Sequence, residues 1–328
     1  MFLNTDSKFI WLNGSFQPFN KTNIHLLTNT LHYGMGVFEG VRAYETSDGG
    51  AIFRLDDHTE RLFDAASKIN ISIPYSINDL CQAQKEAMIK NNLKEGYIRP
   101  IVFLGNESMG LRSQDSLSVN VAIACWEWPS YMDPDAKRNG ISVVKSPFQQ
   151  YDNPLYSNNK IIGTYVNSIM AVNDAISKGA EEAILLDKNG FISEGSGENL
   201  FIVKNSEVMT PTTDYCLNGI TRQSVITIAK NLDLSVEEKN LTFDDLLSAD
   251  EAFYSGTAVE ITPITTVDGT KIGSGSIGPI TDQLQSNYSD IVYGRNRSYL
   301  HWLTAISVSY THLRAHETKA NLVCRLLL

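Results

Sequence analysis

Hydrophobic and polar residues alternate along residues 31–44, LHYGMGVFEGVRAY, most clearly in the second half. From Val37 to Ala43 every second residue points to the same face, which predicts a β-strand whose two faces are used differently. A Ser-Asp-Gly-Gly turn at 47–50 leads into a partner strand over 51–55. Asp56 then caps a helix whose apolar residues recur at helical spacing, namely Leu62, Ala65, Ala66 and Ile69.

A second helix and two further strands complete the first half of the chain. The helix follows Ser76, and apolar strands are expected over 97–105 and 117–126, the second of them in the centre of its sheet. Pro100 places the first of these strands at a sheet edge, or predicts an irregularity near its start. The next segment, WEWPSYMDPDAKRNG, combines two tryptophans, two prolines and a turn cluster, which is typical of an interdomain linker.

The second half alternates strands and helices. Strands are expected over 141–145, 182–187, 199–203, 207–210 and 250–255, and helices over 164–178, 218–232 and 280–292. With 328 residues, this pattern predicts a two-domain α/β protein. We expect a small α/β domain over 1–130, a linker over 131–139 and a larger cofactor-binding domain over 140–306.

Composition limits the class of protein. The chain is 42% hydrophobic and 20% charged, as in ordinary globular proteins, and its net charge of −10 argues against a general nucleic-acid or anionic-membrane surface. Cys81, Cys125, Cys216 and Cys324 are scattered, so neither a zinc site nor a disulfide framework is expected. No run approaches the ~18 apolar residues of a membrane span. The first residues lack the order of a signal peptide, and the protein is therefore expected in the reducing cytoplasm.

The last 22 residues, 307–328, differ from the rest of the chain. They hold three basic residues against one acidic residue, in a chain that is acidic as a whole, and two of its six histidines. We expect this tail to be a translated vector or read-through segment that takes no part in the fold.

Residues 160–199 contain the strongest candidate chemistry. Lys160 is followed by Tyr165 and, 34 residues after the lysine, by Glu194. A lysine can attack an aldehyde cofactor as a Schiff-base nucleophile, and a carboxylate can pair with the nitrogen of the cofactor ring. The ordinary interpretation of Lys160 is a solvated lysine at the start of a helix, and this stretch alone does not decide between the two.

Two glycine-containing turns are candidates for binding a phosphate. Ile220 and Thr221 follow Gly219 at the start of a predicted helix, where free N–H groups and a hydroxyl favour an anion. Gly256 and Thr257 offer similar donors. Arg61 lies at the edge of the apolar face of its helix, and solvation is its ordinary interpretation.

Two other motifs are not expected to be sites. Residues 273–278, GSGSIG, match a dinucleotide-binding motif, but Pro279 follows directly and too little chain remains for a dinucleotide fold, so a loop capping the next helix is expected. His58 and Glu60 have no second histidine at ligand spacing, and no metal is expected.

Seven motifs in order resemble one family, the branched-chain amino acid aminotransferases of the class IV, fold-type IV pyridoxal-phosphate enzymes. They are LHYGMGVFEGVRAY, HTERLFDAA, YIRP, the Lys160 segment, SEGSGENLF, NGITR and SGTAVEITP, and together they cover about residues 8–304. The first motif with YIRP resembles the branched-chain group, whereas D-amino-acid aminotransferases and aminodeoxychorismate lyases usually carry a YGDG-like version. The resemblance implies a smaller N-terminal α/β domain and a larger domain with a barrel-like sheet, with the site in the cleft between them.

The resemblance also implies roles for individual residues. Lys160 would be the Schiff-base lysine and would move the proton between the amino acid Cα and cofactor C4′; its amine must be neutral, which desolvation beside a cationic ring favours. Residues implied to bind pyridoxal 5′-phosphate are Arg61, Lys160, Tyr165, Glu194, Ile220, Thr221 and Thr257. Residues implied to bind the substrate are Tyr33, Phe38, Tyr97, Arg99, Trp128, Tyr131, Thr257 and Ala258, with Arg99 facing the distal carboxylate of glutamate.

The implied reaction is reversible amino transfer between L-leucine, L-isoleucine or L-valine and 2-oxoglutarate by a two-stage ping-pong cycle. An obligate homodimer is also implied, in which Tyr33 and the loop near 107–113 contribute across the interface. D-amino-acid transamination, aminodeoxychorismate lyase chemistry and a cofactor-binding homologue without turnover are the alternatives. The chain departs from the family at Ser157-Asn158-Asn159, at Ile161-Ile162 and at SMGLRSQDS, which bears on the substrate range rather than on the cofactor.

Overall fold

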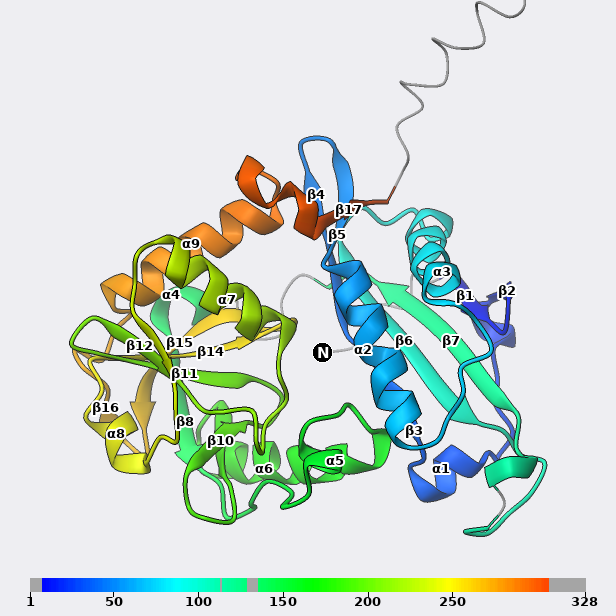
Figure 1. Cartoon of the computed structure of the whole chain (residues 1–328), viewed down its shortest axis with the longest axis horizontal. Coiled ribbons are helices and arrows are strands. Elements are labelled where there is room, and N and C mark those ends of the chain that lie inside the picture. The colour runs from blue at the N-terminus through cyan, green and yellow to red at the C-terminus, as the bar shows by residue number, and fades with distance from the viewer. Residues whose placement is uncertain (1–7, 113, 129–134, 307–328) are drawn as a thin grey trace, which may run out of the picture.

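The computed structural model describes residues 8–112, 114–128 and 135–306, which form two β-sheets with helices packed around them. Figure 1 shows two lobes side by side, one built on each sheet. The second sheet curls into a half barrel. This mixed architecture confirms the predicted α/β class and the barrel-like second sheet.

The first sheet has the strand order β17-β5-β4-β6-β7-β1-β2, and β3 also pairs with β6. Helices α2 (Leu55–Lys68) and α3 (Ile77–Lys90) cover one face, where Leu62, Leu80, Ile98 and Val121 belong to one buried cluster. These side chains lie at the helical and strand spacings that the sequence shows. The strands are β1 Phe9–Leu12, β2 Ser15–Pro18, β3 Gly36–Phe38, β4 Val41–Thr46, β5 Gly49–Phe53, β6 Gly96–Leu104, β7 Val119–Trp126 and β17 Leu303–Ala305.

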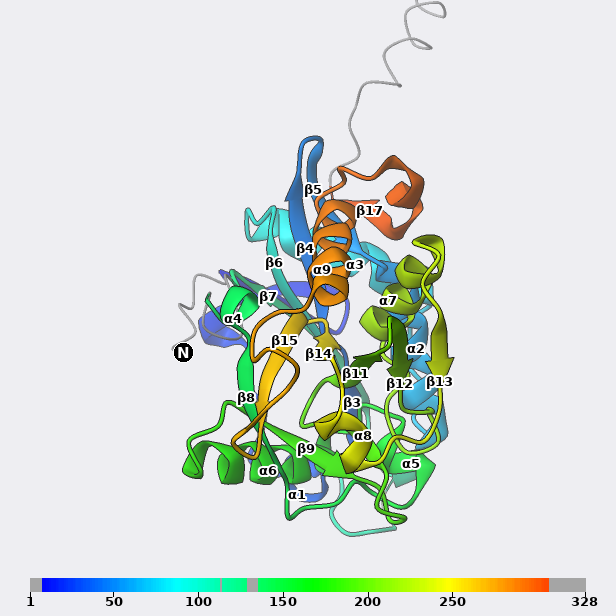
Figure 2. The ribbon, with the colours of Figure 1, turned by 90° about the vertical axis from the view of Figure 1, so that its left-hand side faces the viewer.

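The second sheet has the order β10-β9-β8-β15-β14-β11-β12-β13, with β16 beside β15. Figure 2 shows these strands in order from β8 to β13. Pairing is antiparallel except for β8 with β9, β8 with β15 and β12 with β13. The strands are β8 Ile141–Lys145, β9 Glu182–Leu186, β10 Ile192–Gly195, β11 Asn199–Lys204, β12 Glu207–Thr210, β13 Val236–Glu238, β14 Glu251–Gly256, β15 Glu260–Val267 and β16 Thr270–Lys271.

The long helices match the predicted segments closely. The α-helices are α1 Asn29–Tyr33, α2 Leu55–Lys68, α3 Ile77–Lys90, α4 Ala136–Asn139, α5 Pro154–Ser157, α6 Tyr165–Ser177, α7 Ile220–Asn231, α8 Phe243–Leu247 and α9 Pro279–Val292. Short 3-10 helices are η1 Phe19–Lys21, η2 Gln114–Ser116, η3 Ile162–Thr164 and η4 Arg297–Trp302. In the described part of the chain, no helix is long and apolar enough to cross a membrane.

The N-terminus of α9 explains the GSGSIG segment. Glu251 accepts hydrogen bonds from the backbone N–H groups of Ile280 (3.0 Å) and Thr281 (2.7 Å). The carboxylate therefore occupies the position that a phosphate would need at this helix end. Residues 273–278 form the loop before α9, as predicted.

The strand predicted in the second half of 31–44 is interrupted. The structure has α1 first and then two strands, β3 and β4, which are separated at Glu39-Gly40 and both pair with β6. Pro100, which has no N–H, lies opposite this break, and its carbonyl accepts a hydrogen bond from Glu39 N at 2.9 Å. An edge position for this strand is therefore wrong, because β6 has neighbours on both sides, and the irregularity lies in the facing segment between β3 and β4 rather than in β6 itself.

A buried aromatic cluster joins the two sheets. Tyr44 and Phe53 of the first sheet belong to one cluster with Phe201, Phe253 and Tyr288. The rings of Phe53 and Tyr288 are 5.6 Å apart in an edge-to-face arrangement. Strand β17 returns the chain to the first sheet after the second is complete. The domain limits at 130 and 140 stay a prediction, because residues 129–134 and the 307–328 tail lie outside the described residues.

Candidate active site

Lys160 lies in the short connection between α5 and η3, which contacts the first lobe. Asn153 caps α5 through its side chain, which accepts from Leu155 N at 2.9 Å, and the chain then bends and passes through Lys160 into η3 and α6. The carbonyl of Lys160 accepts a hydrogen bond from Phe38 N at 3.1 Å. The side chain of Ile161 is only 5% exposed and belongs to the core of the first lobe. Ile161, where the sequence departs from the family, therefore anchors the lysine segment to the first lobe.

A close approach of two backbones fixes the same segment. The N–H of Gly163 donates to the carbonyl of Gly34 at 3.1 Å. A Cβ atom on Gly34 would lie 2.6 Å from Gly163 Cα, so only glycine fits there. Gly34 also has a φ of +70°, which favours glycine independently.

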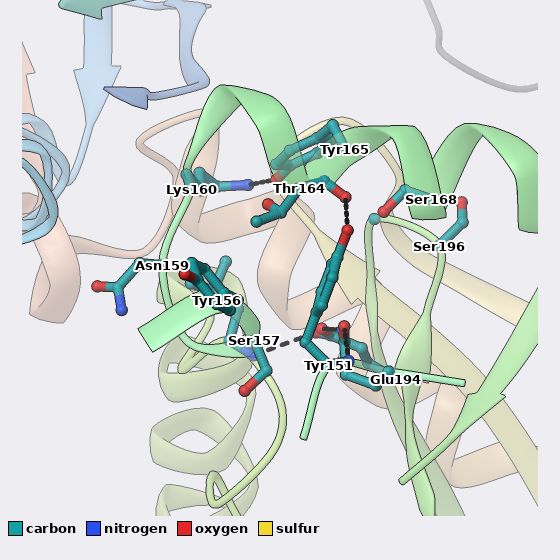
Figure 3. Close-up of a pocket in the computed structure, with 13 residues that line it drawn as sticks. Tyr151, Tyr156, Ser157, Asn159, Lys160, Thr164, Tyr165, Ser168, Glu194 and Ser196 are labelled. Atoms are coloured by element: carbon teal, nitrogen blue, oxygen red, sulfur yellow. Dashed lines mark hydrogen bonds between the residues drawn. The ribbon is translucent and has the colours of Figure 1, made fainter. Parts of the chain in front are cut away.

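Lys160, Tyr165 and Glu194 line one pocket, shown in Figure 3. The amine of Lys160 donates to the hydroxyl of Tyr165 at 2.9 Å. Tyr165 is the first residue of α6, and Lys160 lies in the connection just before η3, which leads into this helix. Other lining residues, which the sequence did not single out, include Gln150, Tyr151, Thr164, Ser168 and Ser196.

Burial and neighbouring charges act in opposite directions on the pKa of Lys160. Burial lowers the pKa of its amine, as expected, but Tyr165 and Glu39 act in the opposite direction and outweigh it. The protein's own groups therefore raise the pKa above the ordinary value of 10.5. The expected neutral amine depends on a cationic cofactor ring beside the lysine, so that expectation stays a prediction.

Glu194 is a buried carboxyl at the edge of the second sheet. Its oxygens accept hydrogen bonds from Gln150 Nε2 (2.6 Å), Leu217 N (3.2 Å) and Asn199 Nδ2 (3.4 Å). Burial raises its pKa to about 8, and these hydrogen bonds and the charge of Lys160 only partly oppose that effect. None of the ion pairs formed within residues 8–112, 114–128 and 135–306 includes Glu194.

Arg61 is not a solvated arginine. Its Nε and Nη2 atoms donate to the two oxygens of Glu39 at 2.6 and 2.9 Å, and its Nη1 atom donates to Asn218 O at 3.2 Å. His58 is a partner of the same carboxylate, with Nδ1 at 2.9 Å from Glu39 Oε2. Glu39 could not be singled out from the sequence, because nothing in the strand alternation distinguishes it. The absence of a metal stays a prediction.

The start of α7 lies beside Arg61. Asn218, whose carbonyl Arg61 binds, comes two residues before Ile220, the first residue of the helix. No side chain caps this helix end. Arg54, also missed by sequence analysis, ties α2 to α7 because its Nη1 atom donates to Ile220 O (3.3 Å) and Ser224 Oγ (3.2 Å). The predicted phosphate residues Arg61, Ile220 and Thr221 therefore come together at one helix N-terminus.

Thr257 and Ala258 form the half-buried turn between β14 and β15. Within the described residues, no hydrogen bond joins Thr257 to Arg61 or to Thr221. Glu260, at the end of this turn, has a φ of +56° and binds Arg42 (2.9 Å) and Lys137 (2.6 Å). The turn is therefore held by ion pairs from the first sheet and from α4.

Four predicted substrate residues form one aromatic group. The guanidinium of Arg99 lies 4.7 Å from the ring centroid of Phe38, and its Nη2 atom donates to Tyr97 Oη at 3.3 Å. The ring of Tyr97 stacks on Trp128 at 4.7 Å. Phe38 meets Tyr165 edge to face at 4.7 Å, which connects the group to the lysine pocket.

Two further predicted substrate residues are not placed in this group. Tyr33, on α1, is 42% exposed, and its ring contact is with His32. Tyr131 lies outside the described residues. Tyr33 was expected to act across an interface between two subunits, and its exposure agrees with a position at the surface of one chain.

A half-buried lysine that is bonded to a phenol shares a pocket with a buried carboxyl, close to an uncapped helix N-terminus, and this combination defines a class of cofactor-dependent enzyme. The sequence profile described as "Amino-transferase class IV" matches residues 36–267, and the chain belongs to this family. A relative from Pseudomonas aeruginosa, a "Branched-chain-amino-acid aminotransferase", is 48% identical over 298 residues, or 90% of this chain and 97% of the relative. The protein of the same description from Escherichia coli K12 is 38% identical over 301 residues, or 91% and 97%.

Solved structures agree with these relatives. The branched-chain aminotransferase from the thermophilic archaeon Thermoproteus uzoniensis, solved with norvaline, superposes with a TM-score of 0.86 at 38% identity, covering 92% of this chain and 100% of that one. The Escherichia coli branched-chain amino acid aminotransferase superposes with a TM-score of 0.89 at 36% identity, covering 92% and 100%. These structures confirm the resemblance found in the sequence.

Proposed function

We propose that the chain catalyses reversible amino transfer between L-leucine, L-isoleucine or L-valine and 2-oxoglutarate, with pyridoxal 5′-phosphate as cofactor and a two-stage ping-pong cycle. The observation that carries the proposal is the pocket in which Lys160 is bonded to Tyr165 opposite the buried Glu194. The family and the branched-chain aminotransferases that cover nearly the whole chain support the same reaction.

The residues fit this cofactor. Glu194 is buried, has a pKa of about 8 and has no ion-pair partner in the described ranges. A protonated ring nitrogen would be the positively charged partner that the described residues do not provide for this carboxyl. Arg61 and the uncapped N-terminus of α7 offer the donors that a phosphate group requires.

When bound, the cofactor supplies an aldehyde and an electron-accepting ring. Lys160 would hold the aldehyde carbon and carry the proton between the substrate Cα and cofactor C4′. Tyr165 would hold the ring oxygen, since its hydroxyl already lies 2.9 Å from the lysine amine. Glu194 would keep the ring nitrogen protonated. Arg61, the amides of Ile220 and Thr221 and the hydroxyls of Thr221 and Thr257 would hold the phosphate.

The aromatic group would select the substrate. Phe38, Tyr97 and Trp128 present apolar rings to a branched side chain, with Tyr33 and Tyr131 proposed to complete the wall. Arg99 would face the distal carboxylate of glutamate, because its guanidinium is planar and can bind a carboxylate through two N–H groups. The amides of Thr257 and Ala258 would take the α-carboxylate.

We propose that two copies of the chain form a homodimer through α1 and the loop after β6. Leu31 (59% exposed) lies on α1 and Leu111 (89% exposed) in that loop. The two segments are joined, since Asn29 N donates to Gly105 O at 2.7 Å. An apolar surface of this kind is typical of a protein interface, and Tyr33 lies within it. Cys81, Cys125 and Cys216 are buried and form no disulfide within the described residues, which supports a cytoplasmic location.

Activity with defined substrates tests the proposal. Purified protein with added pyridoxal 5′-phosphate should convert L-leucine and 2-oxoglutarate to L-glutamate and the branched 2-oxo acid, while D-alanine and aminodeoxychorismate should not react. The relatives do not favour these two alternatives. Turnover of D-alanine or of aminodeoxychorismate in place of L-leucine would overturn the substrate assignment, and absence of all turnover would favour the non-catalytic alternative.

A further inference from the structure

Glu39 and His58 form a buried polar pair outside the roles described so far. Both side chains are 1% exposed, although Glu39 lies in the break between β3 and β4 and His58 on α2. Burying a charged side chain costs free energy and is seldom seen unless the side chain is paired. The buried position of Glu39 and His58 therefore suggests that the pair has a role.

The carboxylate of Glu39 is fully bonded. Oε1 accepts from Arg61 Nε at 2.6 Å, and Oε2 accepts from Arg61 Nη2 (2.9 Å), from Gly40 N (3.2 Å) and from His58 Nδ1 (2.9 Å). Burial alone would raise the pKa of Glu39, but the charge of Arg61 and the hydrogen bonds from His58 and Arg61 outweigh it and hold the pKa well below its usual range. Burial lowers the pKa of His58, so the neutral imidazole donates from Nδ1.

This arrangement leaves part of Arg61 for another ligand. A guanidinium has five N–H groups, of which Glu39 takes two and Asn218 O takes one. The Nη1 atom of Arg61 faces the segment that leads into α7, and Glu39 binds the opposite edge of the guanidinium through Nε and Nη2. Without Glu39, a single hydrogen bond of 3.2 Å to Asn218 O would be the remaining link of Arg61 across the site.

The structure assigns Glu39, supported by His58, the role of a positioning residue that aims Arg61 at the phosphate of the cofactor. The assignment rests on the proposed function. It also connects the two ends of the site, because the preceding residue, Phe38, bonds through its N–H to Lys160 O and packs on Tyr165. One dipeptide thus holds the lysine segment on one side and the phosphate arginine on the other.

Two roles of Glu39 make opposite predictions for Glu39→Gln. If the carboxylate only neutralised Arg61, its removal would strengthen phosphate binding by leaving more positive charge. If it positions Arg61, the loss of a short bidentate pair weakens phosphate binding. A bidentate, charge-assisted pair is much stronger than the single amide hydrogen bond that glutamine keeps, so we expect the second outcome.

The test compares the dissociation constants of pyridoxal 5′-phosphate and of pyridoxal, which lacks the phosphate, for the full-length apoprotein. In Glu39→Gln, the preference for the phosphorylated form should fall roughly tenfold to a hundredfold, with pyridoxal binding unchanged. Glu251→Gln is the matched control, because Glu251 is a buried carboxyl that binds the N-terminus of α9. Glu39→Asp, which keeps the charge but shortens the reach, should recover only part of the preference.

The outcomes separate this inference from the proposed function. A wild-type protein that binds both compounds equally would overturn the phosphate site itself. A wild-type preference that Glu39→Gln keeps or increases would overturn the role of Glu39 alone. If Glu39→Gln does not fold, His58→Gln is measured instead. An unchanged preference for the phosphorylated form in folded His58→Gln would contradict the positioning role of Glu39 and His58. A reduced preference would support that role.

Discussion

Replacing Glu194 by glutamine should stabilise the apoprotein and weaken the holoenzyme. The carboxyl is buried in the pocket and its pKa rises from the ordinary 4.5 to about 8. At a pH between these two values, the carboxyl keeps its proton in the folded protein but is ionised in the unfolded chain. The folded state then binds more protons, so stability falls as pH rises from about 4.5 to about 8.

The size of the effect follows from the two pKa values. At pH 8 the buried carboxyl costs about 4 kcal/mol of folding free energy, and at pH 5 about 1 kcal/mol. Glutamine removes this cost but has one acceptor oxygen where Glu194 has two, so it loses one of the hydrogen bonds from Gln150 and Leu217, worth about 1 kcal/mol. The net gain for Glu194→Gln is therefore about 3 kcal/mol at pH 8 and near zero at pH 5.

Urea unfolding of the two apoproteins at pH 5, 6, 7 and 8, followed by tryptophan fluorescence, measures this difference. Glu60→Gln, at an exposed carboxyl on α2, controls for the change of net charge. Adding pyridoxal 5′-phosphate should reverse the order, because the ring nitrogen pairs with the carboxylate and not with an amide. A stability difference that does not grow with pH, or a variant that gains as much from the cofactor as the wild type, would refute the reasoning.

Three further changes test the site, the surface and the tail. Lys160→Ala should abolish transamination and the shift of the near-visible absorbance band with substrate, while the melting temperature of the apoprotein changes little; retained activity would contradict the role of Lys160. Leu31→Asp with Leu111→Asp should convert the dimer to monomers in light scattering, because both exposed leucines lie on the proposed interface; an unchanged mass would contradict the assignment of that surface. Deleting 307–328 should leave the activity and the melting temperature unchanged, and a clear loss in either would show that the tail takes part in the fold.

Long periodic segments could be predicted from the sequence. Helices α6, α7 and α9 begin and end within two residues of the predicted limits, because their apolar faces and end residues give independent signals. The motif around Lys160 also placed the lysine, Tyr165 and Glu194 in one site, and the structure brings these three together. Their roles rest on the family rather than on spacing.

Features that depend on partners distant in the sequence could not be predicted. The break at Glu39-Gly40 is understood only beside Pro100, and the role of Arg61 only beside Glu39, which is 22 residues away. Likewise, Gln150 reaches Glu194 over 44 residues. Local periodicity contains no information on such contacts, since the two partners lie on different elements. Ile161, which differs from the family, is explained by its burial in the core of the first lobe.

The most direct test of the central claim is absorbance spectroscopy of the reconstituted protein during single additions of substrate. With pyridoxal 5′-phosphate, the wild type should show a near-visible band that shifts when L-leucine is added and returns when 2-oxoglutarate follows. Lys160→Ala should show no such cycle. A wild-type protein without this band, or a band that L-leucine does not change, would contradict the assignment of Lys160 and of the reaction.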